Sequence, residues 1–268
     1  MQNPNKRIIV LRYHDEFGLC LNQVRWLRKL NPGVKIVGMY GGTKAIPAPL
    51  IAALDGNYVS PFDARFNWMH CDLVLADWFR TVGHGYHFDI LNLIEWDWLT
   101  LESLDAVYGA EPNTVYLADK QTFKDLTAGG WHWTTQKFEQ RFRDQVAECE
   151  GFFGKLNWGD FCAGIFGGIQ IPRAFLEKYA TYTPQPLTND EARMCLWAQA
   201  MGFKMADNGM EREPNFVTAS GEYKNLDYAG FSDRVTRGAA AMHPVRTIAL
   251  FKTLTGIKKR LRKISADD

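Results

Sequence analysis

The sequence predicts an α/β fold in which a mixed, mainly parallel β-sheet is flanked by helices. Residues 7–12 and 34–40 are short apolar runs typical of buried strands, and residues 18–30 between them place apolar side chains at helical spacing. A strand, a helix and a second strand in succession form a βαβ unit, whose crossover makes the two strands parallel. A further apolar run at 88–94 follows a second helical stretch at 63–82. This repeated alternation indicates a parallel sheet covered by helices.

Local signals place the ends of these elements. Cys20, Val24 and Leu27 share one face of the first helix, and the turn sequence NPG ends it. The stretch 63–82 repeats apolar residues at helical spacing, and a pair of glycines closes it. The second half of the chain is less regular, and residues 100–160 match no pattern that we can place. Beyond an aromatic loop that leads into a helix at 129–145, the expected elements are a glycine-broken strand at 161–171, helices at 172–180 and 189–202, and a short strand at 203–207.

The composition narrows the class of protein. The chain has 268 residues and a net charge of +1, so no overall basic field favours nucleic acid as a partner. Its five cysteines are scattered and mostly have apolar neighbours, which predicts reduced thiols in a cytoplasmic protein. We expect neither a signal peptide nor a membrane span, because no apolar run approaches the roughly 20 residues that a bilayer requires.

Two carboxylates follow the predicted strand at 88–94. Glu95 and Asp97 are separated only by Trp96, and the sequence around them is strongly apolar. Ligands of open α/β sheets bind beyond the carboxyl ends of the strands, which is where this strand delivers the pair. Alternate residues of an extended strand point to the same side, so both acids are expected to face one spot. Two carboxylates at close range are unfavourable unless a cation lies between them, and Mg²⁺ or Mn²⁺ accepts such oxygens.

The alternative is that both acids simply meet solvent at a strand end, since acid-x-acid is a common pattern. Other nucleotide-binding motifs are absent from the sequence: Gly41 and Gly42 lack the lysine and spacing of a P-loop, and no G-x-G-x-x-G occurs. These absences disfavour a P-loop ATPase and a nicotinamide-dependent dehydrogenase.

The order of motifs resembles a glycosyltransferase of the GT-A fold, a Rossmann-like architecture. The βαβ opening (RIIVLRYHDE) and ILNLIEWDW resemble that fold's first strand and the strand that ends in its Asp-x-Asp signature. FCAGIFGGIQIPRAFLEKY, LTNDEARMCLWAQAMGFKM and AAMHPVR resemble its acceptor-side strand, its catalytic helix and its late histidine. The first signature position here is glutamate, which departs from the family. The resemblance implies one catalytic domain over residues 1–247, followed by a basic tail at 248–268.

The resemblance also implies roles for individual residues. Asp97 is the expected direct ligand of Mn²⁺ or Mg²⁺, with Glu95 and His243 completing the metal site. The nucleotide-diphosphate sugar that serves as donor would contact a set of residues along the strand ends, namely Arg12, Tyr13, Glu95, Trp96, Gly167 and Gly168. Asp190 or Glu191 is the expected catalytic base of an inverting transfer to a carbohydrate or lipid-linked acceptor. We favour Asp190, because Thr188 and Glu191 fit a capping box that would engage Glu191.

Several alternatives remain open at this stage. Trp131 and Trp133 form either an acceptor platform or part of the core. The tail from Pro244 onward forms an amphipathic basic helix that either makes peripheral contact with an anionic membrane or packs on its own domain. Two other functions compete with a glycosyltransferase: a sugar-phosphate nucleotidyltransferase, and a non-catalytic scaffold that binds a sugar or nucleotide. The acidic, glycine-poor segment after the first strand argues against the nucleotidyltransferase.

Overall fold

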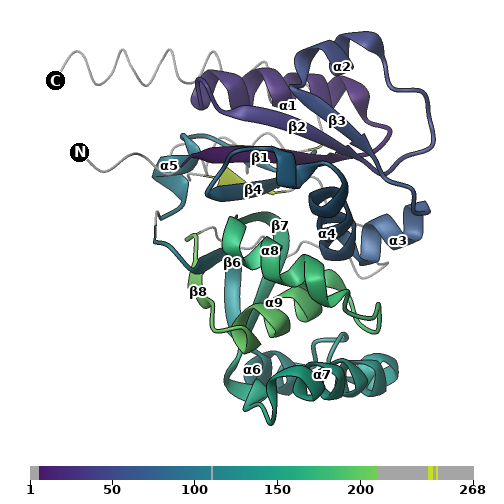
Figure 1. Cartoon of the computed structure of the whole chain (residues 1–268), viewed down its shortest axis with the longest axis vertical. Coiled ribbons are helices and arrows are strands. Elements are labelled where there is room, and N and C mark those ends of the chain that lie inside the picture. Colours follow the sequence, from purple (N-terminus) through teal and green to yellow (C-terminus); the bar gives the residue numbers. More distant parts are fainter. Residues whose placement is uncertain (1–5, 110, 210–240, 244–245, 247–268) are drawn as a thin grey trace, which may run out of the picture.

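The computed structural model describes residues 6–109, 111–209, 241–243 and 246, and its centre is a seven-stranded sheet (Figure 1). The strand order is β3-β2-β1-β4-β7-β6-β8. The strands are β1 (Arg7–Tyr13), β2 (Lys35–Tyr40), β3 (Gly56–Val59), β4 (Ile90–Glu95), β6 (Thr114–Thr122), β7 (Cys162–Pro172) and β8 (Lys204–Asp207). All pairings among these strands are parallel except those of β7, which runs antiparallel to both β4 and β6. The predicted mixed, mainly parallel sheet is therefore confirmed.

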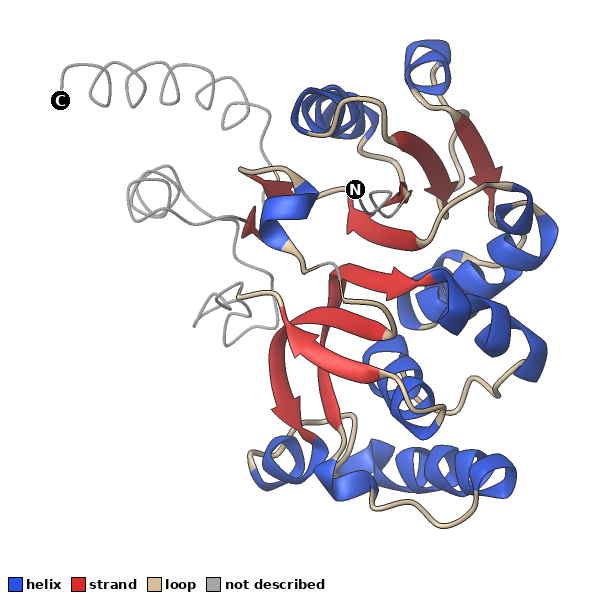
Figure 2. Ribbon diagram, turned by 60° about the vertical axis from the view of Figure 1, so that its left-hand side comes forward, coloured by secondary structure: helices blue, strands red, loops and turns tan. Residues whose placement is uncertain are grey.

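Helices cover both faces of this sheet (Figure 2). They are α1 (Phe17–Leu30), α2 (Ala48–Ala53), α3 (Ala64–Met69), α4 (Cys71–Thr81), α5 (Leu104–Val107), α6 (Phe123–Ala128), α7 (Glu139–Phe153), α8 (Arg173–Tyr182) and α9 (Asp190–Ala200). Short 3-10 turns occur at η1 (Gly83–Gly85), η2 (Gln136–Phe138) and η3 (Trp158–Asp160). None of the helices within the described ranges combines the length and apolarity that a bilayer span requires.

The alternation of side chains along β1 divides the core into two halves. Ile8 and Val10 pack with α4, α8 and α9, whereas Ile9 and Leu11 pack with α1 and α2 on the opposite face. Because both faces are buried, the strand reads as a continuous apolar run rather than an alternating one. This explains why β1, β2 and β4 could be recognised in the sequence.

The structure differs from the sequence-based prediction of the elements in three places. The single helix expected at 63–82 is two helices, because the backbone breaks at His70, whose φ and ψ are −134° and 41°. The loop after β2 contains α2 and leads to β3, neither of which was predicted. Strand β6 lies in the region that the sequence left unassigned, and it pairs with β7 across two register shifts. The predicted tail at 248–268 lies outside the described residues.

Candidate active site

A cavity of about 860 Å³ opens where β1, β2 and β4 end. The predicted site residues on its wall are Arg12, Tyr13, Glu95, Trp96, Asp97, Gly167, Asp190, Glu191 and His243. Gly168 is the one predicted site residue outside the lining. The other predicted site residues come from five separate segments of the sequence, and the fold brings them together at one cavity. The roles assigned to them remain predictions.

Glu95, Asp97 and His243 converge in this cavity. Glu95 is the last residue of β4, and a turn in which the Trp98 amide donates to the Glu95 carbonyl at 3.0 Å carries Asp97 back toward it. One potential ligand atom from each of the three residues lies within 4.8 Å of the other two. His243 Nε2 is 3.4 Å from Glu95 Oε2 and 3.3 Å from Asp97 Oδ1. The sequence analysis predicted that Glu95 and Asp97 would face one spot, and the two side chains do so here.

A short ladder places His243 beside the acids. Strand β9 (Ala241–Met242) pairs antiparallel with β5 (Leu99–Thr100). His243 directly follows β9, and β5 begins two residues after Asp97. The His243 ring also lies against Trp98, with 5.6 Å between ring centroids. The local structure therefore fixes a histidine that is distant in sequence against the turn that carries Asp97.

The three groups perturb one another electrostatically. Burial alone lowers the pKa of His243, but hydrogen bonds and charge interactions with Asp97 and Glu95 raise that pKa to about 9. Burial raises the pKa of Asp97, but His243 and Arg246 outweigh it, so this pKa is lowered. These shifts favour two carboxylates and an imidazolium in the cluster at neutral pH. Because a metal binds neutral imidazole, a metal ion bound here at neutral pH would displace the His243 proton.

Two arginines complete the charge balance. Arg12 pairs in register with Glu95 across β1 and β4, and its Nη1 donates to Glu95 Oε1 at 2.5 Å. Burial raises the pKa of Glu95, but the Arg12 guanidinium and His243 reverse this, so the pKa falls below its usual value. Arg246 donates through Nε to Asp97 Oδ2 at 2.8 Å. Sequence reasoning assigned no role to Arg246, although it lies in the same short motif as His243.

Two glycines of β7 make room for this cluster. A Cβ at Gly167 would lie 2.7 Å from Glu95 Oε2, so a larger residue would displace that carboxylate. Gly168 has a φ of +68°, and the Trp98 ring occupies the position of a Cβ there. The first glycine therefore admits the acid, and the second admits the tryptophan beneath the site.

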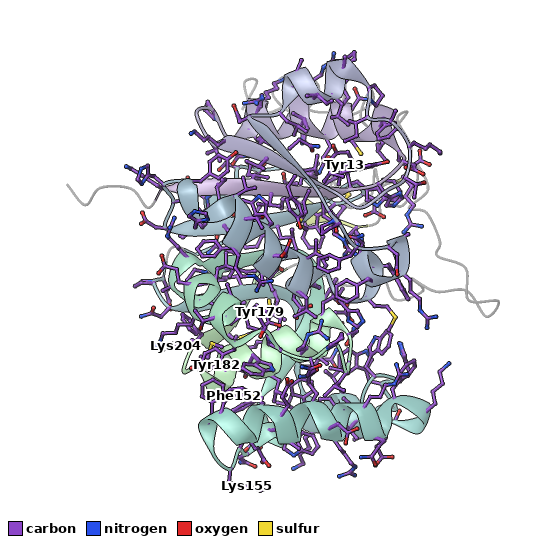
Figure 3. All side chains as sticks on the ribbon, turned by 45° about the vertical axis from the view of Figure 1, so that its right-hand side comes forward. Tyr13, Phe152, Lys155, Tyr179, Tyr182 and Lys204 are labelled. Atoms are coloured by element: carbon purple, nitrogen blue, oxygen red, sulfur yellow. The ribbon has the colours of Figure 1, made fainter. Side chains whose placement is uncertain are left out.

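Aromatic residues that directly follow β1 and β4 form another part of the wall. The rings of His14 and Trp96 meet edge to face at 4.7 Å, and Arg246 lies over Trp96 at 5.5 Å. Tyr13 instead directs its hydroxyl to Asn57 Oδ1 at 2.7 Å and is 1% exposed, so its side chain belongs mainly to the core (Figure 3). His14 therefore offers the cavity an aromatic ring that sequence reasoning did not single out.

Asp190, the predicted base, lies at the start of α9 and is 5% exposed. Its Oδ2 accepts from the Cys71 amide at 3.3 Å, and its Oδ1 accepts from the Glu191 amide at 3.0 Å. Burial raises the pKa of Asp190 well above its usual value, because only part of the lost hydration is offset by Arg12 and Arg193. A carboxylate with a raised pKa is a stronger base than an ordinary one.

The prediction of a capping box formed by Thr188 and Glu191 at the start of α9 is wrong. The N-cap residue is Asn189, whose Oδ1 accepts from the Ala192 amide at 3.2 Å. Asparagine is as good an N-cap as threonine or better, so it displaces Thr188 from that position. Glu191 still lines the cavity, and its carboxylate accepts from Asn189 Nδ2 at 3.2 Å.

A buried ion pair holds α9 against α4. Arg193 donates to both carboxylate oxygens of Asp72, and both side chains are at most 1% exposed. The Tyr179 hydroxyl donates to the same carboxylate, and His70 Nδ1 lies 3.3 Å from two Arg193 nitrogens. Arg193 lies one turn after Asp190, so this anchor fixes the position of the predicted base.

An aromatic loop forms the wall on the α9 side. Trp131, His132 and Trp133 all line the cavity, and Gly130 precedes them with a φ of +76°. Trp133 is 8% exposed and packs on Phe138 at 4.6 Å, while Trp131 lies 6.4 Å from Phe123 of the core. Both tryptophans therefore pack on core aromatic residues and also line the cavity, while a role as acceptor platform remains a prediction.

Comparisons with known proteins give matches only among solved structures. No protein-family model matches the sequence, and no curated protein matches it. The galactosyltransferase LgtC in complex with donor and acceptor sugar analogs is 12% identical, with a TM-score of 0.49 over 93% of this chain and 95% of that one. The mannosyltransferase PcManGT from Pyrobaculum calidifontis, in complex with GDP-Man and Mn²⁺, is 12% identical, with a TM-score of 0.42 over 88% of this chain and 61% of that one. A likeness of this degree assigns no activity and no residue role to the present chain.

Proposed function

We propose that this protein is a glycosyltransferase that moves a sugar from a nucleotide-diphosphate sugar to a hydroxyl acceptor. The observation that carries the proposal is the convergence of Glu95, Asp97 and His243 within one cavity that also contains Asp190. Two carboxylates and an imidazole in reach of one point form a divalent cation site, and a buried carboxylate nearby provides a base.

The three converging side chains fit a divalent metal. Glu95 and Asp97 would supply oxygen ligands and His243 a nitrogen ligand, a set that suits Mn²⁺ better than Mg²⁺ because of the imidazole. A bound cation would neutralise charge on the departing diphosphate as a Lewis acid. Arg246, already held against Asp97, adds a second positive charge at the same place.

The acceptor is proposed to approach from the α9 side of the cavity. Asp190 takes the proton of the attacking hydroxyl, while its backbone hydrogen bonds to Cys71 and Glu191 hold the carboxylate in place. The aromatic loop with Trp131 and His132 lines the same cavity and offers apolar ring faces to a carbohydrate acceptor.

One observation favours a second candidate, a non-catalytic module that binds a sugar or nucleotide. Arg12, His243 and Arg246 already neutralise both acids without any metal. Such a module would bind a ligand in the same cavity without turning it over.

Incubation with a panel of nucleotide sugars, with Mn²⁺ or Mg²⁺, tests the proposal. Slow release of nucleoside diphosphate from one donor is expected from the wild-type protein, and the Asp97→Asn variant should lose it. Asp105→Asn is the matched control, because this carboxylate is 87% exposed and pairs with Arg7 outside the cavity. Binding without release would favour the non-catalytic module, and absence of both would refute the proposed function.

A further inference from the structure

One aromatic side chain in the cavity is exposed to an unusual degree. Within the described part of the chain, the large apolar side chains classed as exposed are Ile51, Val59, Trp68, Val82 and Phe152. Trp68 is 57% exposed, and it is the one member of this set that lines the cavity. An indole left in water is a large apolar surface that a planar ligand can cover. The other four residues are therefore ordinary surface residues, whereas Trp68 has a place in the site.

The backbone that carries Trp68 is firmly held. Arg12 Nη2 donates to the carbonyls of Asn67 and Trp68 at 2.6 and 3.1 Å, while Nη1 of the same guanidinium binds Glu95. Asn67 Nδ2 donates to the carbonyls of Phe62 and Asp63 at 2.7 and 2.8 Å. Because its backbone is fixed, the Trp68 side chain projects from a defined position at the cavity, which lowers the ordering cost when a ligand stacks on it.

The position of α3 indicates which part of a ligand meets Trp68. The Asn67 side chain lies 2.9 Å from the position of a Cβ on Gly41, at the end of β2, and Arg12 is near the end of β1. The acid pair follows β4, which is the next strand of the sheet, and Gly167 belongs to β7 beyond it. The base candidate Asp190 and the aromatic loop lie on the α9 side. A diphosphate at the acids would therefore direct its nucleoside toward β1, β2 and α3.

We propose that Trp68 is the stacking platform for the nucleobase of the donor and of the departing nucleoside diphosphate. The inference rests on the proposed function and deepens it, because it assigns a residue to the base. Every base has a π-face, so stacking supplies affinity with little preference among bases. Removing an aromatic platform weakens binding by about 5- to 150-fold, the equivalent of the roughly 1–3 kcal/mol that base stacking contributes.

The test compares a ligand that has a base with one that lacks it. Dissociation constants of UDP, GDP and inorganic pyrophosphate are measured calorimetrically in Mn²⁺ for the wild-type protein and for Trp68→Ala. We expect Trp68→Ala to weaken one or both nucleoside diphosphates by at least about fivefold and to leave pyrophosphate unchanged within about twofold. Trp68→Phe should restore most of the loss, because it keeps an aromatic face. Phe152→Ala is the control, since Phe152 is 54% exposed and does not line the cavity.

Four outcomes would overturn the inference in distinguishable ways. If Trp68→Ala bound the nucleoside diphosphates as tightly as the wild type does, Trp68 would have no part in binding, and the proposed function would stand. Equal weakening of pyrophosphate and of the nucleoside diphosphates would show that Trp68 acts on the diphosphate site. Wild-type protein that bound pyrophosphate no more weakly than UDP or GDP would have no base subsite, and if it bound none of the three, the proposed function would fail as well.

Discussion

Two clusters of opposite charges lie close to the start of α9, and they differ in what surrounds them. In the first, Arg193 and Asp72 form a bidentate pair, and neither side chain is more than 1% exposed or lines the cavity. In the second, Glu95 and Asp97 share His243, and all three face the cavity. The first cluster pairs one acid with one base in closed geometry. The second brings two acids and an imidazole to one point beside the cavity, and Arg12 and Arg246 supply further positive charge from its edges.

This difference shows how buried charge can be sorted into structural and functional kinds. The Asp72 carboxylate accepts three hydrogen bonds from Arg193 and Tyr179 and is 1% exposed, so no ligand can reach it. Asp97 is almost as deeply buried, at 2% exposed, yet its partners His243 and Arg246 come from the end of the described chain, beside an open cavity. Burial alone therefore does not distinguish the two acids, whereas convergence at a cavity does, and this convergence is why we propose a functional role for Asp97.

Asp190 lies between the two clusters, and the largest expected effect is there. Asp190→Asn removes the proposed base but keeps the shape and the acceptor oxygen of the side chain. Turnover should fall by about 10²- to 10⁴-fold, with donor affinity changed little. Steady-state kinetics with donor and acceptor varied separately would measure this. Full activity in the variant would assign the base to Glu191 or indicate a retaining reaction.

The structural cluster should respond in the opposite way to the cavity cluster. Asp72→Asn leaves the Arg193 charge buried without a counter-ion, so the free energy of unfolding should fall by about 3 kcal/mol. Chemical denaturation would measure it, and donor affinity should survive in the folded variant. Asp97→Asn should lose less than about 1 kcal/mol of stability, because Arg246 is 29% exposed and can be solvated, and His243 keeps Glu95 as a counter-ion. Equal losses in both variants would erase the distinction between the clusters.

A smaller effect concerns the pH dependence of the structural cluster. Burial, followed by the Arg193 charge, lowers the pKa of His70 to about 4 from 6.5. Between pH 6.5 and pH 4, His70 is therefore protonated in the unfolded chain but neutral in the native state. Protonation of the unfolded chain lowers the free energy of unfolding progressively as the pH falls from 6.5 toward 4. His70→Gln keeps an acceptor for Arg193, so its stability should fall less between pH 7 and pH 4, as denaturation at both pH values would reveal. Parallel curves for both proteins would contradict this assignment.

The sequence was most informative where elements are buried on both faces. Strands β1, β2 and β4 are continuous apolar runs, and the acids at the end of β4 could be read directly from the same run. Strand β6 was missed because its residues 114–122 mix apolar and charged side chains and pair irregularly with β7. The break at His70 was missed because the apolar spacing of residues 63–82 continues through it and gives no sign of two helices.

The candidate site could be predicted only in part, because some of its features are local in the sequence and others depend on the fold. Acid-x-acid after a strand is a local pattern, but the environment of each acid depends on partners from other elements. Arg12 could be placed because it ends β1, whereas the ion pair between Arg246 and Asp97 needs the fold of the chain around β9. The exposure of Trp68 likewise follows from the position of α3, which no periodicity in the sequence determines.

The central claim is that the Glu95, Asp97 and His243 cluster holds a divalent cation. Titration of Mn²⁺ into the protein, followed by the loss of the electron paramagnetic resonance signal of free Mn²⁺, tests it directly. The expected result is one bound Mn²⁺ per chain in the wild type and in Asp105→Asn, with affinity at least about tenfold weaker in Asp97→Asn. A wild-type protein that leaves all Mn²⁺ free, or an Asp97→Asn variant that binds it equally well, would contradict the account.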